Sequence, residues 1–397
     1  MCALLLALFA VCGCASGTAQ SSPGEISVSN AVQDSMRRVL DRAIADSAFP
    51  GAFAIAGGHD AVYASMGVGH LDWKQPSPVP DDGTIWDMAS LTKIIGMTTA
   101  MMQLWADHRV DLDAPVQRYL PAWSGPGKER VMVRHLLTHS SGLPAWRPLY
   151  KESTTAAEAM TLVYATPLDT VPGARMVYSD LGAILLGQIV ERVSGQRLDS
   201  YLVDHVFRPL GMSSTMYRPD SSLLSRIAPT EFDPWRQRHV HGEVHDENAF
   251  ALGGISAHAG LFSSGHDMAR YARMILNGGT LDGARILTPE AIATFTRVQD
   301  SALSNRALGW EVPNGQNSAG HRLSAHAFGH TGFTGTSLWI DPDRDLYLVL
   351  LSNRVNPTRE NRRIGGVRTA LADAVSGALA ASRPAGLTSS SPTAVRP

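Results

Sequence analysis

A serine and a lysine stand three residues apart in Ser90-Leu91-Thr92-Lys93, which is the only Ser-x-x-Lys in the chain. At the start of a helix, residues i and i+3 share a face, so the hydroxyl and the ammonium would meet. A serine hydroxyl needs an adjacent base to act as a nucleophile, and a partly buried lysine loses its charge readily enough to serve as one. The pattern therefore predicts a nucleophile at Ser90, with Lys93 as its proton partner. The alternative is a surface lysine beside a helix-capping serine, which the apolar neighbours of Lys93 disfavour.

Helices and strands must position Ser90 and Lys93. An apolar, methionine-rich stretch over 88–105 has helical spacing and would begin at Ser90. Strand-like runs occur near both ends of the chain, and helical patterns lie at its two ends and in its middle. The strand-like runs are 51–56, 61–68, 336–340 and 346–351, and the clearest helices are 32–44, 181–193 and 364–379.

This order predicts an α/β (α+β) fold, in which an antiparallel sheet built from both termini is flanked by helices and carries an inserted, mostly helical domain. We expect a signal peptide over 1–19 and a linker over 20–28. The α/β domain would combine 29–95 with 296–380, and the helical domain would span 96–295. The last stretch, 381–397, is rich in Ser, Pro and Ala and is expected to be a disordered tail.

The N-terminal segment favours export. Its apolar run, 3–11, is too short to span a bilayer and is followed by small residues. Val11-Cys12-Gly13-Cys14 resembles a bacterial lipobox, which implies lipidation of Cys14; plain secretion after ordinary signal-peptidase cleavage is the alternative. All three cysteines lie in this segment, so the rest of the chain has no disulfide, thiolate metal site or cysteine nucleophile.

Composition excludes some classes of function. The formal charge is −2 and the isoelectric point is about 6.7, so nothing indicates binding to nucleic acid or to an acidic membrane surface. No lysine occurs after Lys151. The chain has no Gly-x-Ser-x-Gly, phosphate-loop or dinucleotide glycine pattern, and we expect no cofactor.

Two further patterns follow the Ser-x-x-Lys in chain order, Tyr178-Ser179-Asp180 and His330-Thr331-Gly332. With them, the sequence resembles the penicillin-binding protein and class C β-lactamase family of serine hydrolases, which includes D,D-peptidases and β-lactamase-fold carboxylesterases. The resemblance covers about residues 30–380. The surrounding segments that support it are 86–89, 134–143, 243–246 and 258–262.

The resemblance implies roles for these residues. Ser90 would attack the substrate carbonyl, Lys93 and Tyr178 would share the proton transfers, and the amides of Ser90 and Phe333 would form the oxyanion hole. Which of Lys93 and Tyr178 is the base stays open. A phenolate stabilised by Lys93 is favoured, because an ordinary phenol is protonated at neutral pH unless a cation is near. Substrate would contact Asp180, His330, Thr331 and Gly332.

Two departures from the family pattern bear on the substrate. Asp180 stands where the family usually has asparagine, and an ionised carboxylate cannot donate to an acylamino carbonyl. Asp180 would also hold Lys93 charged. His330 stands where many members have lysine, and a free histidine titrates near pH 6.5, so its attraction for a carboxylate should weaken with pH. Both changes point away from an efficient β-lactamase; if His330 is only structural, an arginine such as Arg354 would bind the carboxylate.

We therefore expect a bacterial, exported serine hydrolase, periplasmic or membrane-anchored through a lipid, that cleaves an amide or ester through a Ser90 acyl-enzyme. A D-Ala-type peptidase or an esterase is favoured; a class C-like β-lactamase and a non-turnover penicillin-binding sensor are the alternatives. The partner would be a small molecule or peptide: a cell-wall peptide, an ester or a β-lactam. His239, His241, Glu243 and His245 alternate as strand-borne metal ligands would, but a polar loop is favoured and no metal is expected.

Overall fold

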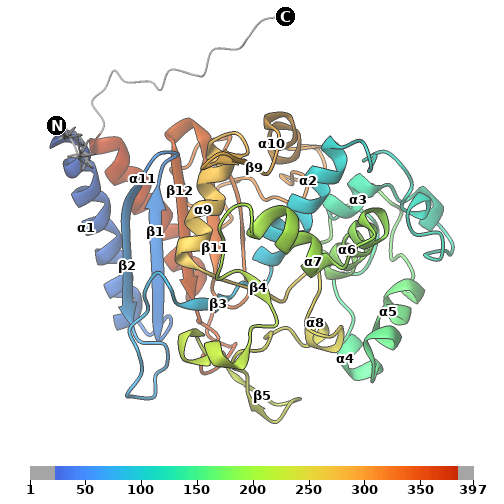
Figure 1. Cartoon of the computed structure of the whole chain (residues 1–397), viewed down its shortest axis with the longest axis horizontal. Helices are drawn as coiled ribbons and strands as arrows, with labels where there is room; N and C mark the ends of the chain where they lie inside the picture. Colours follow the sequence, from blue (N-terminus) through green and yellow to red (C-terminus); the bar gives the residue numbers. More distant parts are fainter. Residues whose placement is uncertain (1–22, 383–397) are drawn as a thin grey trace, which may run out of the picture.

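The centre of the molecule is a five-stranded antiparallel sheet with strand order β10-β11-β12-β1-β2 (Figure 1). The computed structural model describes residues 23–382. The strands come from opposite ends of the chain, and Phe53 of the first pairs with Leu351 of the last. The strands are β1 (Gly51–Gly57), β2 (Val62–Gly69), β10 (Phe328–Thr331), β11 (Ser337–Asp341) and β12 (Leu346–Ser352).

Helices cover both faces of this sheet. On one face, α1 (Pro23–Ala45) and α11 (Ile364–Ser382) pack against each other and share a core with β1, β2 and β12. On the other face lies α9 (Gly265–Leu276), which contacts β1 and β12 (Figure 1). Every residue of β1 and β12 is therefore buried, and neither strand shows the alternation of a half-exposed strand.

A second, three-stranded sheet with order β3-β7-β4 lies between the central sheet and the helical side of the molecule. Its strands are β3 (Ile85–Asp87), β4 (Met216–Tyr217) and β7 (Leu261–Ser264). Two small hairpins complete the strands: β5 (Phe232–Asp233) with β6 (Arg238–His239), and β8 (Thr280–Leu281) with β9 (Ala284–Arg285).

The helical side continues from β3. A six-residue π-helical segment, η1 (Lys93–Thr98), leads into α2 (Thr99–Ala106), and both are largely buried. α6 (Asp180–Ser194) packs against them and ends at Gly195, whose φ is 78°. The remaining α-helices are α3 (Val133–Leu137), α4 (Leu149–Glu152), α5 (Ala156–Ala165), α7 (Leu198–Leu202), α8 (Glu247–Ala251) and α10 (Pro289–Thr296).

Five further short helical segments occur along the described chain: η2 (Val116–Arg118), η3 (Lys128–Arg130), η4 (Val203–Phe207), η5 (Ser221–Arg226) and η6 (Pro342–Arg344). In the part of the chain that the structure describes, no helix is both long enough and apolar enough to cross a bilayer.

The predicted fold class is confirmed, including a sheet that joins the two ends of the chain. Two details differ from expectation. Residues 23–28 of the expected linker are the first turns of α1. Residues 265–276, assigned to the helical domain, form α9 on the central sheet, because its buried face packs there. The expected signal peptide, Cys14 and the tail beyond 382 lie outside the described residues.

Candidate active site

Ser90 follows β3 and precedes the buried helix that contains Lys93. The preceding residue, Ala89, has a φ of 45°, which is a strained conformation for a residue with a Cβ. Asp87 holds this turn: its Oδ1 accepts the Ala89 amide at 2.8 Å, and its Oδ2 accepts the His245 amide at 2.7 Å. Burial raises the pKa of Asp87. The turn thus projects Ser90 at the start of the helix.

Lys93 is 1% exposed and uses all three of its donors. Its Nζ lies 3.1 Å from Ser90 Oγ, 2.9 Å from the carbonyl oxygen of His258 and 2.7 Å from Asp180 Oδ1. Burial alone would lower the pKa of Lys93, but the carboxylate of Asp180 and the phenol of Tyr178 outweigh it and raise the pKa above that of a free lysine. Lys93 is therefore an ammonium at neutral pH.

Because the ammonium donates to Ser90 Oγ, the hydroxyl proton of Ser90 must point away from Lys93. A second group is needed to take that proton. Tyr178 is that candidate: the Lys93 Nζ lies 4.9 Å from its ring centre, and its buried hydroxyl has no hydrogen-bond partner among residues 23–382. Tyr178 as the base stays a prediction, and the charged state of Lys93 is consistent with it.

The ring of Tyr178 is held by histidine on two sides. His139 lies 4.5 Å away and His330 5.8 Å away, centre to centre. The Nδ1 of His139 accepts the amide of Ser179, next to Tyr178 in the chain, at 3.1 Å. Burial, with the charges of Arg306 and Lys93, lowers the pKa of His139 well below that of a free histidine. His139 is therefore a neutral acceptor that positions the Tyr178 segment.

A pair made of buried His258 and half-buried Asp246 supports the other side of Lys93. His258, whose carbonyl oxygen accepts from Lys93, places its Nε2 2.9 Å from Asp246 Oδ1 and its Nδ1 2.7 Å from Ser256 Oγ. Although burial disfavours a carboxylate, His258 lowers the pKa of Asp246. Both residues lie in segments that support the family resemblance, but no role was predicted for either.

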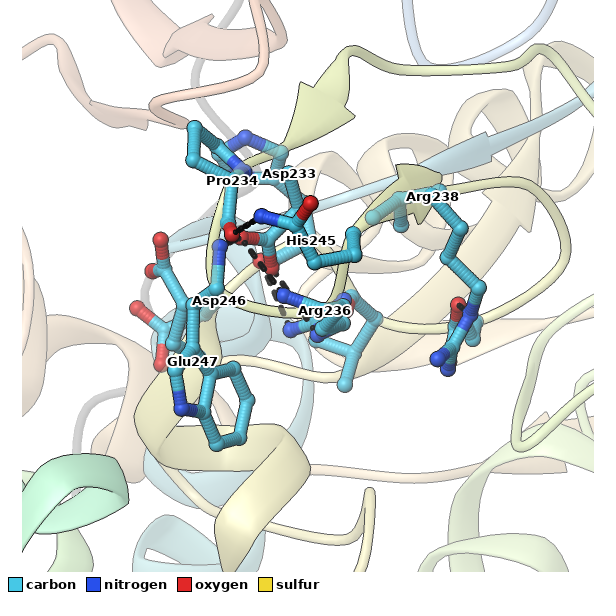
Figure 2. A network of polar contacts seen from close by, with 12 residues as sticks. Asp233, Pro234, Arg236, Arg238, His245, Asp246 and Glu247 are labelled. Atoms are coloured by element: carbon cyan, nitrogen blue, oxygen red, sulfur yellow. Dashed lines mark hydrogen bonds and ion pairs between the residues drawn. The ribbon is translucent and has the colours of Figure 1, made fainter.

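Asp246 belongs to a polar network (Figure 2). Arg236 donates to the carbonyl oxygens of Val244 and His245 and pairs with Asp233 at 3.1 Å. These contacts fix the segment before α8, from which Asp246 reaches His258.

The third motif lies on the edge strand β10 and the turn after it. Two hydroxyls tie this turn to the nucleophile segment: Thr334 donates to the carbonyl oxygen of Asp87 at 2.7 Å, and Thr336 to that of Met88 at 3.1 Å. A Cβ on Gly332 would lie 2.6 Å from the carbonyl oxygen of Met88, so only glycine fits. These contacts bring the two halves of the site together.

His330 differs from expectation. It is 3% exposed, and its Nδ1 lies 2.8 Å from the carbonyl oxygen of Thr331, which requires the proton on Nδ1. Burial and the charges of Arg306 and Lys93 lower the pKa of His330 well below 6.5. The expectation that His330 changes charge near neutral pH is therefore wrong, because the side chain is desolvated between cations. Its Nε2 is buried, has no partner within the described residues, and is an acceptor.

The two amides expected to form the oxyanion hole are available. Within residues 23–382, neither the Ser90 amide nor the Phe333 amide donates to a protein acceptor. The carbonyl of Phe333 is held by Arg354 Nε at 2.7 Å, and its ring, half exposed, stacks on His245. The structure therefore leaves both donors free for a substrate oxygen.

A cavity of about 360 Å³ adjoins Ser90. Three arginines and one acid line it, which gives it a positive lining: Arg306, Arg354, Arg368 and Glu311. Arg368 Nη2 donates to the carbonyl oxygens of Gly332 and Thr336, both at 2.7 Å, and burial lowers the pKa of Arg368 to about 9. It is thus still a cation at neutral pH.

From the sequence, Arg354 was predicted to bind a substrate carboxylate only if His330 is structural, and Arg306 and Arg368 were not predicted at all. Arg368 lies in α11, and Arg306 in a loop without a recognisable motif. Local sequence carries no signal for either residue, because only the packing of distant segments brings them to Ser90.

Three of the four alternating residues considered as metal ligands have separate polar partners. His241 Nε2 lies 2.9 Å from the carbonyl oxygen of Ile227, Glu243 pairs with Arg238, and His245 Nε2 lies 2.7 Å from Glu231. No group of three or more His, Cys, Asp or Glu side chains within residues 23–382 is arranged to hold a metal ion.

Comparison with solved structures supports the fold. EstCE1, described as a hydrolase with promiscuous acyltransferase activity, superposes with a TM-score of 0.71 at 22% identity, covering 90% of this chain and 100% of that one. A penicillin-binding protein homologue from Caulobacter crescentus superposes with a TM-score of 0.70 at 20% identity, covering 91% and 99%. At these identities the likeness concerns the fold.

Curated proteins found by sequence have a higher identity to this chain than these two solved structures. A protein of Escherichia coli (strain K12) named "Putative D-alanyl-D-alanine carboxypeptidase" is 34% identical over 304 residues, which cover 68% of this chain and 69% of that protein. A protein of the same name from Salmonella schwarzengrund (strain CVM19633) is 32% identical over 313 residues, covering 71% and 72%. The family model described as Beta-lactamase matches residues 36–372. The chain belongs to the Beta-lactamase family, whose fold it shares.

Proposed function

We propose that this protein is a serine D,D-carboxypeptidase that removes the C-terminal D-alanine from a peptide ending in D-Ala-D-Ala. The observation that carries the proposal is the arginine-lined cavity beside Ser90. Its three cations and one acid favour a substrate that brings a carboxylate close to the scissile bond. The names of the relatives from Escherichia coli and Salmonella point to the same substrate class.

The proposed reaction proceeds in two steps. Ser90 Oγ bonds to the carbonyl carbon of the penultimate residue while its proton passes to Tyr178. The tetrahedral oxyanion is held by the amides of Ser90 and Phe333. When the peptide bond breaks, the leaving amine takes the proton from Tyr178 and departs as D-alanine. Water then attacks the ester on Ser90 and gives a proton to Tyr178. When the bond between the acyl carbon and Ser90 Oγ breaks, Tyr178 returns that proton to Ser90 Oγ and the shortened peptide is released.

Lys93 has an electrostatic role in this proposal. Its ammonium stays protonated between Asp180 and Ser90, and it stabilises a phenolate at Tyr178. Asp180 forms an ion pair with Lys93, and as a carboxylate it cannot donate to an acylamino carbonyl. This arrangement disfavours efficient β-lactam hydrolysis.

The test is a substrate comparison with four compounds: an acylated D-Ala-D-Ala peptide, the same peptide with a C-terminal amide, a short-chain nitrophenyl ester and nitrocefin. We expect the free-acid peptide to have the highest kcat/KM and the amide to lose at least about tenfold, the effect of one charge-assisted contact. Product must exceed one equivalent of enzyme, whereas a penicillin-binding sensor would stop there. Ser90→Ala should abolish hydrolysis and labelling by a fluorescent penicillin. A higher kcat/KM on the ester or nitrocefin would replace the proposal with an esterase or a β-lactamase.

We also propose that the protein is exported to the periplasm and anchored by a lipid on Cys14, on the basis of the N-terminal sequence alone. Metabolic labelling with radioactive palmitate, followed by cell fractionation, tests this. We expect label in the membrane fraction for the parent and for Cys2→Ala, and none for Cys14→Ala. An unlabelled but periplasmic parent would indicate plain secretion.

A further inference from the structure

Arg306 lies against the ring of Tyr178. The centre of its guanidinium is 5.2 Å from the ring centre, and the Lys93 Nζ is 4.9 Å from the same point. The side chain is 8% exposed, and its Nη1 is buried without a partner among residues 23–382. Its nearest acid is Glu311, at 3.7 Å from Nη2, which is too long for a hydrogen bond. The charge of Arg306 is therefore only partly compensated.

Local structure fixes this placement. Arg306 and Glu311 form an isolated β-bridge, and Glu311 exchanges two backbone hydrogen bonds with Gly329 of β10, at 2.9 and 2.8 Å. The turn between them is anchored by Gly309, whose amide donates to the carbonyl oxygen of Leu137. A loop without a motif is thus held to the strand that carries His330, next to Tyr178.

We propose that Arg306 is a positioning residue that supplies the second cation beside Tyr178 and holds the phenolate needed for proton transfer from Ser90. The third motif does not supply this cation, because His330 is neutral, with its proton on Nδ1. A guanidinium and an ammonium beside the ring attract the negative charge that the Tyr178 oxygen carries when it has no proton. The proposal rests on the proposed role of Tyr178 as base.

The charged and titratable groups facing Tyr178 come from several segments. Lys93 and Asp180 lie on the nucleophile side, and His139 and His330 flank the ring. The charge of Arg306 is among the causes that keep both histidines neutral, after burial itself. Arg306 and Lys93 are consequently the two cations adjacent to the ring among the described residues.

The test uses Arg306→Gln and Arg306→Lys in the full-length protein, with Arg208→Gln as the matched control. Arg208 is also an arginine paired with an acid, but it is 71% exposed on the surface. The readout is the pH dependence of kcat/KM on a neutral nitrophenyl ester, repeated as the rate of Ser90 labelling by a fluorophosphonate. Neither probe has a carboxylate, so a loss of substrate anchoring cannot lower either rate.

We expect Arg306→Gln to move the acidic limb of both profiles upward by about one pH unit and to lower the rate at pH 7 about tenfold. Arg306→Lys should restore most of the rate, and Arg208→Gln should match the parent. In the Arg306→Gln background, His330→Lys should bring the limb back down, because it places a cation beside the same ring.

Two outcomes would overturn the proposal. A loss confined to the carboxylate-bearing peptide, with the ester profile unchanged, would make Arg306 a substrate anchor. A lower rate at every pH with an unmoved limb and a lower melting temperature would make it structural. Failure of the proposed function would look different: Ser90→Ala would keep its activity, or the parent would not turn over the peptide while the limb still moved on the ester.

Discussion

The two walls of the site differ in how their polar atoms are satisfied. On the wall that carries the nucleophile, Lys93 uses every donor, Asp180 pairs with it at 2.7 Å, and His258 is held by Asp246. On the opposite wall, buried polar atoms lack partners among the described residues. They are the Tyr178 hydroxyl, His330 Nε2, Arg306 Nη1 and Arg368 Nε.

An unpaired buried polar group costs free energy, so these atoms need a reason to persist. Three of their four residues are charged or can donate, and all four line the cavity beside Ser90. A substrate carboxylate or carbonyl would accept from the arginine donors, and a peptide N–H would be needed to donate to His330 Nε2. The polar atoms of Lys93 are therefore satisfied before substrate arrives, whereas the second wall keeps buried polar atoms that substrate can satisfy. Substitutions on the two walls should fail in different ways.

The largest effect is expected from Lys93→Met. The variant removes three donated hydrogen bonds and leaves the Asp180 carboxylate unpaired beside Tyr178, where it opposes a phenolate. We expect kcat/KM to fall on the order of 10³-fold for every substrate, because proton transfer is affected rather than recognition. Steady-state kinetics on peptide and ester check this, with Lys74→Met, an exposed lysine, as control. A loss restricted to one substrate would contradict the proposed division between the walls.

Asp180→Asn should have a smaller effect with a distinct pH signature. In the parent, Asp180 and Tyr178 outweigh burial and raise the pKa of Lys93, so its proton is retained throughout the working range. Without the carboxylate, burial lowers the pKa of Lys93, and the ammonium loses its proton as pH rises. We expect kcat/KM to fall about tenfold at pH 7 and a new basic limb to appear below pH 10.

The control for this variant is Asp113→Asn, which removes a carboxylate paired with Arg134 on the surface. Both variants lose one negative charge, so a general effect of net charge would appear in both profiles. A profile for Asp180→Asn that keeps the parent's shape would show that Lys93 is not held charged by this residue.

The two walls also differ in how much of their structure could be predicted from the sequence. Ser90 and Lys93 are three residues apart on one helix, and the local pattern was enough to predict their contact. The long strands and helices of the fold were predicted for the same reason, because their apolar spacing is local. β3 and β7 were not predicted, because they are three and four residues long and pair across 175 or more positions.

The second wall depends on distant segments. The motif identified His330, but its charge state follows from burial and from Arg306, 24 positions earlier in the chain. Arg368 comes from the last helix. A histidine in isolation would titrate near pH 6.5, and nothing in the residues beside it predicts that it is neutral. The protonation state of this wall is a tertiary property.

The smallest expected effect is that the preference for a carboxylate-bearing substrate does not change with pH. This prediction tests the charge of His330 on the second wall. The ratio compares kcat/KM for the free-acid peptide with kcat/KM for the neutral ester, so contributions common to both substrates, such as Tyr178 and Lys93, cancel. A histidine that gained a proton between pH 8 and 5.5 would attract the carboxylate more strongly at low pH, and the ratio would fall as pH rises. In this protein burial, Arg306 and Lys93 all lower the pKa of His330, and only the Thr331 carbonyl opposes them.

A proton on Nε2 of His330 would add a third cation between two others, so His330 stays neutral throughout this range and the ratio should vary by less than about twofold. The carboxylate is instead attracted by arginines, whose charge does not change there. His330→Gln keeps a neutral side chain and should leave the ratio flat, which makes it the matched control. A ratio in the parent that falls about tenfold from pH 5.5 to 8, and becomes flat in His330→Gln, would show that substrate brings a proton to His330 and that this wall changes its charge on binding.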